Sequence, residues 1–166
     1  MTPASLAKRS STLFLQIVIV FLGLGVLALM LWEPHLEGRN AHATTFEIYF
    51  KDPFLAYAYL ASIAFFVALF QAFTLLGYIR RNEVFSPQSV KALRTIKYCA
   101  ITLVAMIAGA LGYLFIYMRT RDDIAGGVAI GVVLTFVSVV IGTAAAVFER
   151  LLQSAVDLKT ENDLTV

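Results

Sequence analysis

The chain has 166 residues, a length that suits one domain, but its composition departs from that of a water-soluble protein. Hydrophobic residues make up 60% of it and charged residues 14%, whereas soluble domains contain about 45–50% and about 25%. So little polar surface cannot cover a soluble fold, and the bilayer must solvate most side chains. The net charge of +2 does not favour direct nucleic-acid binding, and the lone Cys99 excludes an internal disulfide.

Four apolar runs without Asp, Glu, Lys or Arg follow one another along the chain. Each is long enough to match the about 20 residues that a helix needs to cross the hydrocarbon of a bilayer. The runs cover residues 13–32, 54–79, 98–118 and 124–148. They predict an all-α, polytopic membrane protein with four transmembrane helices in a single domain. The first run exceeds the 7–15 apolar residues of a signal peptide, so we expect it to be retained.

The segment between the first two runs, residues 33–53, contains the only grouping of metal-ligand types, with His35 and His42 among glutamates. The histidines are seven residues apart and a proline and a glycine lie nearby, whereas catalytic zinc sites place paired histidines on regular structure. A solvated loop is the favoured interpretation. No nucleophile–base pair, phosphate-binding loop or CxxC pair occurs, so we predict neither a catalytic role nor a metal or cofactor.

Gln71 lies well inside the second run. Its simplest role is a hydrogen bond to a neighbouring helix, and a substrate contact is the alternative. Transporters usually place ionisable residues or helix breaks within the membrane, and none of the four runs contains an ionisable residue or a proline. Coupled ion transport is therefore disfavoured, and a small oligomeric transporter or channel stays as the alternative function.

The segment between the second and third runs is the most patterned polar stretch. Ser86 followed by Pro87 predicts a helix start, with a capping hydroxyl and a proline at the first helical position. Val90, Leu93 and Lys97 then have the spacing of a short amphipathic connector helix that leads into the third run. Its basic residues suit anchoring at anionic head groups, and docking of a cytoplasmic partner is the other interpretation.

Lys and Arg residues divide unevenly between the two sides of the predicted membrane. Nine lie in the N-terminal tail, the segment between the second and third runs, and the C-terminal tail, whereas four lie on the other side. Because cytoplasmic segments carry the excess of basic residues, both termini are predicted in the cytoplasm.

The fourth run carries small residues at four-residue spacing. Gly127 and Gly131 form a GxxxG motif, and Ser138 and Gly142 repeat the spacing further along. Small side chains at this spacing let helix backbones approach closely. We predict contact with the third run, to which a five-residue turn connects it, and a homodimer is the alternative.

Residues 149–166 are predicted to extend the fourth helix and to end in a tail. The tail alternates in the manner of a strand, which would present one apolar face to a partner. It consists of Glu161, Asn162, Asp163, Leu164, Thr165 and Val166.

The C-terminal sequence from Phe148 to Val166, FERLLQSAVDLKTENDLTV, resembles the closing signature of the domain of unknown function 2975 family. The segment from Asn82 to Arg94 is also similar to the connector of that family. The resemblance implies a small four-helix, multi-pass protein of the bacterial inner membrane, without an established activity. Members are often encoded beside a small helix-turn-helix regulator, which implies a regulatory or accessory protein that binds a cytoplasmic partner.

Overall fold

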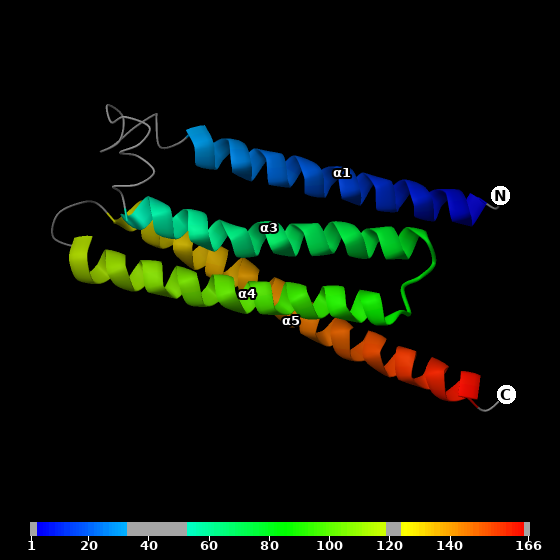
Figure 1. Cartoon of the computed structure of the whole chain (residues 1–166). Helices are drawn as coiled ribbons and strands as arrows, with labels where there is room; N and C mark the ends of the chain where they lie inside the picture. Colours follow the sequence, from blue (N-terminus) through cyan, green and yellow to red (C-terminus); the bar gives the residue numbers. More distant parts are fainter. Residues whose placement is uncertain (1–2, 33–52, 119–123, 165–166) are drawn as a thin grey trace.

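The computed structural model describes residues 3–32, 53–118 and 124–164, with side chains described for 10–32, 54–116 and 124–162. This part of the chain is helical apart from the short connector between α3 and α4 (Figure 1). A π-helical turn, η2, continues α4 without a break. The elements are α1 (Pro3–Trp32), α3 (Pro53–Arg80), α4 (Pro87–Tyr113), η2 (Leu114–Met118) and α5 (Ala125–Leu164).

The four long helices run alternately up and down, so the start of α1, the α3–α4 connector and the end of α5 lie at one end of the molecule (Figure 1). We call this end the connector end. All four helices contain stretches long and apolar enough to cross a membrane, which confirms the predicted all-α architecture. Residues 33–52 and 119–123 lie outside the described residues, and so do both histidines.

Each helix packs mainly on its neighbour in the chain: α1 on α3, α3 on α4, and α4 most extensively on α5. The helices therefore form an open row and do not close around a common axis. Side chains on the flanks of this row have no protein neighbour within the described chain. In a bilayer, lipid covers such flanks without cost, because acyl chains are as apolar as the side chains.

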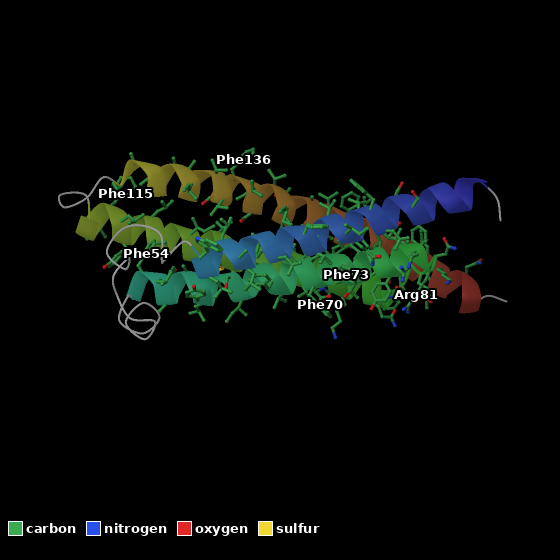
Figure 2. The ribbon with its side chains drawn as sticks, turned by 90° about the horizontal axis from the view of Figure 1, so that it is seen from above. Phe54, Phe70, Phe73, Arg81, Phe115 and Phe136 are labelled. Atoms are coloured by element: carbon green, nitrogen blue, oxygen red, sulfur yellow. The ribbon has the colours of Figure 1, made fainter. Side chains whose placement is uncertain are left out.

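Burial is inverted relative to a soluble protein. Large apolar side chains point outward; Phe70, Phe115 and Phe136, labelled in Figure 2, are 67%, 49% and 69% exposed. Several of the most buried side chains are instead polar, among them Gln16, Ser89, Ser138 and Glu149. A soluble protein exposing this much apolar surface would aggregate, so the pattern supports a lipid environment.

The end of α3 and the start of α4, which flank the connector, are capped by residues of the connector. Asn82 adopts a left-handed φ of 60°, and the amides of Asn82 and Glu83 donate to the carbonyls of Ile79 and Tyr78 at 3.2 and 2.9 Å. These two bonds form a Schellman motif, which satisfies carbonyls that the end of the helix would leave unpaired.

Ser86 caps the next helix, since its hydroxyl accepts from the amide of Ser89 and Pro87 follows it, as predicted. The predicted connector helix is not seen as an element of its own. Pro87–Tyr113 is one continuous α-helix, and the amphipathic residues form its first turns. No further proline interrupts the helix between Pro87 and Tyr113.

The inward face of α5 follows alternating steps of four and three residues. Buried or half-buried residues occupy every position of this spacing: Gly131, Thr135, Ser138, Gly142, Ala145, Glu149, Leu152 and Val156. This 3.5-residue period is the seam of a left-handed helix pair. Gly142 faces Ala100, Gly131 faces Leu111 and Gly127 faces Leu114, so the two helices pair in a constant antiparallel register.

The C-terminal tail does not adopt the predicted extended conformation. α5 runs for 40 residues to Leu164, so the strand interpretation of Glu161–Leu164 is wrong. Helix propagation explains the difference, because each added residue gains a backbone hydrogen bond once the helix exists, and no breaker lies between Ala125 and Leu164. Thr165 and Val166 lie outside the described residues.

Candidate functional site at the connector end

A compact hydrophobic core lies at the connector end. Leu93, Ile96 and Ala145 are at most 7% exposed, and Ala72, Leu75 and Leu152 pack against them from α3 and α5. Val90 and Ala92 on the first turns of α4 are also buried. Three helices therefore meet here around large aliphatic side chains, which fixes the positions of the polar groups around them.

The carboxylate of Glu149 lies on the seam of α5, one step before Leu152. Its Oε1 accepts from Arg94 Nε at 2.7 Å and its Oε2 accepts from Lys97 Nζ at 2.6 Å. The Glu149 side chain is 10% exposed, whereas those of Arg94 and Lys97 are 52% and 24% exposed. The ammonium of Lys97 also lies 4.9 Å from the Tyr98 ring centroid. One carboxylate of α5 thus joins two cations of α4.

Glu149 directly follows the apolar run 124–148, so the ion pairs form where the apolar part of the seam ends. The hydrogen bonds from Arg94 and then Lys97 hold the pKa of Glu149 below its usual range, although burial acts in the opposite direction. The carboxylate is therefore charged at neutral pH. Its arrangement indicates a structural tie between α4 and α5 more than an acid–base catalyst, because both oxygens are engaged.

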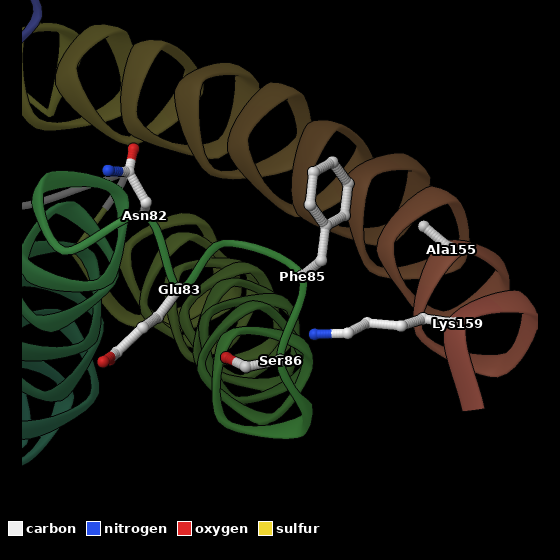
Figure 3. A pocket seen from close by; sticks show the side chains of 6 residues that line it. All are labelled: Asn82, Glu83, Phe85, Ser86, Ala155 and Lys159. Carbon is white, nitrogen blue, oxygen red and sulfur yellow. The ribbon is translucent and has the colours of Figure 1, made fainter. Parts of the chain in front are cut away.

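A groove of ≈ 580 Å³ separates the connector from the end of α5 (Figure 3). In Figure 3 the Phe85 ring points from the connector toward α5, and the Lys159 side chain extends from α5 toward the connector. We call it the connector groove; it is lined by Asn82, Glu83, Phe85, Ser86, Ala155 and Lys159. Phe85 is 59% exposed, so the groove offers an aromatic surface beside one cation and one carboxylate.

A second groove, of ≈ 540 Å³, lies between the first turns of α4 and the α5 extension. Two cations, Lys91 and Arg94, lie along it above an apolar floor. We call it the basic groove; it is lined by Pro87, Val90, Lys91, Arg94, Thr95, Tyr98, Gln153, Val156 and Asp157. The Asp157 carboxylate accepts a hydrogen bond from Gln153 Nε2 at 2.8 Å.

The small residues predicted as packing positions face α4. A Cβ added to Gly131 would lie 2.6 Å from Leu111 Cδ2, and one added to Gly142 would lie 3.1 Å from Ala100 Cβ. A Cβ added to Gly127 would lie 3.4 Å from Leu114 Cδ1 of η2, and Ser138 is 8% exposed. The predicted α4–α5 contact through these residues is thus present within one chain.

Gln71 was expected to form a hydrogen bond to a neighbouring helix, but a different glutamine forms such a bond. Gln16 of α1, 7% exposed, donates its Nε2 to the carbonyl of Phe73 at 3.3 Å. Gln71 is half-buried, and no hydrogen bond of its side chain is found within the described residues. Thr74 and Thr135 donate to carbonyls one turn earlier in their own helices at 2.9 and 2.8 Å. These hydroxyls need no partner from a neighbouring helix.

The sequence reasoning missed the pairing of Glu149 with Arg94 and Lys97, and it missed the groove around Phe85. A signal for the first was present: Glu149 continues the four-and-three spacing of the small residues, so a helix that buries them also buries its carboxylate. A signal for Ser89, which is fully buried and donates to the carbonyl of Glu83 at 3.2 Å, was its position three residues after the N-cap.

Comparison with known proteins identifies relatives but no activity. A family model described as protein of unknown function (DUF2975) matches residues 39–166. The chain belongs to this family. It is also 43% identical over 160 residues to the uncharacterized membrane protein YoaS of Bacillus subtilis (strain 168), an alignment that covers 96% of this chain and 99% of YoaS. No solved structure matches.

The two matches confirm the family resemblance seen in the C-terminal sequence and establish a membrane protein with four candidate spanning helices. The family match covers α3, α4 and α5 with their connector, and therefore both grooves and the Glu149 ion pairs. The alignment with YoaS extends over α1 as well, because it covers nearly the whole chain.

Proposed function

We propose that this protein is a non-enzymatic regulatory or accessory membrane protein that binds a cytoplasmic protein at its connector end. The observation that carries the proposal is the α5 extension. α5 is 40 residues long, about 60 Å at 1.5 Å per residue, and thus about twice the hydrocarbon thickness. Its final turns therefore project beyond the lipid.

Apolar surface is exposed on this projecting part. Leu151 and Leu158, one heptad apart, are 61% and 67% exposed, and Phe85 of the connector is 59% exposed. These three residues follow or precede the apolar runs, so hydrocarbon does not account for them. Exposed apolar side chains outside the bilayer are typical of a protein-binding surface.

The connector groove joins the two regions that the sequence suggested separately as contacts, the connector and the C-terminal extension. Its Phe85 ring and Lys159 ammonium suit a partner that presents an apolar side chain next to a carboxylate. The last described turn, with Glu161 and Asn162 exposed on α5, would widen this surface. The small helix-turn-helix regulator that the family resemblance implies is the first candidate partner.

The orientation is part of the proposal, because the partner can bind only if the connector end is cytoplasmic. Labelling of single cysteines with a membrane-impermeant maleimide tests this in a Cys99→Ser background. Gln88→Cys suits the connector end, since Gln88 is exposed whereas its neighbour Ser89 is fully buried. We expect Asn40→Cys, in the external segment, to react in intact cells and Gln88→Cys only after lysis. Reaction of Gln88→Cys in intact cells would mean that the connector end is external, and it would contradict the proposed topology.

Binding is tested by co-purification of the candidate regulator with the full-length protein from native membranes. We expect Phe85→Ala combined with Lys159→Gln to abolish capture, while Phe115→Ala, which removes an exposed ring at the opposite end, leaves it unchanged. Deletion of residues 161–166 should leave insertion intact and weaken or abolish capture. Equal capture by the wild type, the groove variant and the deletion variant would contradict the proposal.

A further inference from the structure

The basic groove is distinct from the connector groove, because the two share no lining residue. Tyr98, at one end of the basic groove, begins the third apolar run, and the fourth run ends at Phe148, immediately before Glu149. The groove therefore begins where the hydrocarbon ends. Arg94 and Lys91 lie one and two turns beyond Tyr98 on α4 and continue along the groove wall.

The charges of this groove favour an anion at its membrane end. Arg94 gives its Nε to Glu149, yet its side chain stays 52% exposed, and Lys91 is exposed. The Asp157 carboxylate, which also lines the groove, lies two turns beyond Glu149 on α5 and is hydrogen-bonded by Gln153. Because α4 and α5 are antiparallel, Asp157 lies at the end away from the membrane, and the cations lie between it and the lipid.

The remaining lining suits an amphiphilic ligand. Val90 and Val156 form an apolar floor, and the Thr95 hydroxyl and the Tyr98 ring border the membrane end. Below Tyr98, which is 59% exposed, the outer face of α4 continues with Ile101 at 56% exposure. A ligand whose anionic group lies beside Lys91 and Arg94 could therefore extend its chains along this apolar face.

We propose that the basic groove binds the phosphate head group of an anionic phospholipid. The cations supply charge-assisted hydrogen bonds to the phosphate oxygens, and the exposed face of α4 below Tyr98 receives an acyl chain. The site would fix the depth of α4 in the bilayer and would leave the connector groove accessible.

Native mass spectrometry of the full-length protein in detergent, titrated with phosphatidylglycerol or phosphatidylcholine, tests the site. We expect phosphatidylglycerol to bind more tightly than phosphatidylcholine. Lys91→Gln should weaken phosphatidylglycerol binding about fivefold, the equivalent of one basic residue near a lipid surface. Lys91 is exposed, so the variant should keep the wild-type melting temperature, and this is measured alongside.

Arg81→Gln is the matched control. Arg81 is exposed at the same end of the molecule and lies two residues after the second apolar run, but it does not line the groove. We expect it to leave phosphatidylglycerol affinity unchanged. Equal losses in Lys91→Gln and Arg81→Gln, or equal binding of the two lipids, would overturn the site, because diffuse attraction to a basic surface would then explain binding. If inorganic phosphate alone raised the melting temperature as much as phosphatidylglycerol does, the groove would be assigned to a soluble anion and the lipid proposal would be overturned.

Discussion

The two halves of the α4–α5 seam pack through side chains of different sizes. In the apolar half, Gly131, Ser138 and Gly142 bring the helices together through small side chains. At the connector end, Leu93 and Ile96 form a core with Ala145, Leu152 packs against it, and Val90 is also buried. The helix pair is continuous, and the change in side chains occurs close to where the third run begins and the fourth run ends.

The physical reason is that the hydrophobic effect operates only against water. In lipid, burying a leucine removes it from an equally apolar environment, and helices gain mainly from close backbone approach and dispersion. Beyond the lipid, each large aliphatic side chain buried from water contributes about 1.5–3 kcal/mol. Glu149 lies between the two halves of the seam. Its carboxylate pairs with Arg94 and Lys97 across the seam, at a level where charged groups can still reach water.

Truncation of the connector-end core should have the largest effect on stability. Leu93 is 6% exposed, so Leu93→Ala should destabilise the protein by about 2–5 kcal/mol through lost burial and a cavity. Thermal or denaturant unfolding in mild detergent provides the measurement. Leu158→Ala is the matched control, because Leu158 is 67% exposed and its truncation leaves no cavity. Similar losses in both variants would mean that this end has no water-driven core.

Enlargement of a small residue tests the apolar half. The Cβ of a larger residue at position 131 would come within 2.6 Å of Leu111, so Gly131→Leu should destabilise the protein by about 1–3 kcal/mol through overpacking. Gly126→Leu is its control, since a Cβ at Gly126 meets nothing within 4 Å. If both variants unfold at the wild-type temperature, the helices do not depend on close approach in this half.

Neutralisation of Glu149 should have a smaller effect on stability, confined to the junction between the two halves of the seam. Water can replace part of the hydrogen bonding that the half-exposed Arg94 loses. Glu149→Gln should increase amide hydrogen exchange in the last turns of α5 and leave Gly131–Gly142 unchanged. A carboxyl whose folded pKa is lowered stabilises the fold above its unfolded pKa, about 4.3, and that contribution is lost as pH falls through the folded value.

The wild type should therefore lose the protection of these turns in acid, and Glu149→Gln should show a weaker pH dependence. Glu83→Gln, at an exposed position of the connector, serves as the control and should keep the wild-type profile. A pH profile shared by the wild type and Glu149→Gln would show that the ion pairs do not stabilise the extension.

The sequence was sufficient for the features that depend on solvent and local chemistry. Four uncharged runs predict four long helices, Ser86-Pro87 predicts the start of α4, and the spacing of Gly127 and Gly131 predicts the α4–α5 contact. It was misleading at the tail, where the alternation of Glu161–Leu164 suggested a strand although the preceding helix had no reason to stop. Local pattern is weak evidence next to an established helix, because propagation needs no new nucleus.

The candidate site was harder to predict because its parts come from distant positions. Phe85 and Lys159 line one groove, and Arg94 and Glu149 pair across 55 residues. Which residues face each other depends on the antiparallel register of α4 and α5, and the lengths of the apolar runs do not fix that register. Gln16 and Gln71 illustrate the same limit: both lie inside apolar runs, and only the packing of α1 on α3 decides which one finds a partner.

That pair of glutamines supports the smallest prediction. Gln16 joins α1 to α3 through the carbonyl of Phe73, so Gln16→Leu should cost about 0.6 kcal/mol, the average for a hydrogen bond between membrane helices. Gln71→Leu removes the same amide from a half-buried position without a cross-helix partner in the described chain, and we expect it to be neutral or slightly stabilising. Because α1 packs mainly on α3, the loss in Gln16→Leu should appear as faster amide exchange in α1, with α4 and α5 unaffected. A larger loss in Gln71→Leu would mean that its amide contributes an interaction between copies of the chain or with a ligand, the role that the sequence left open for it.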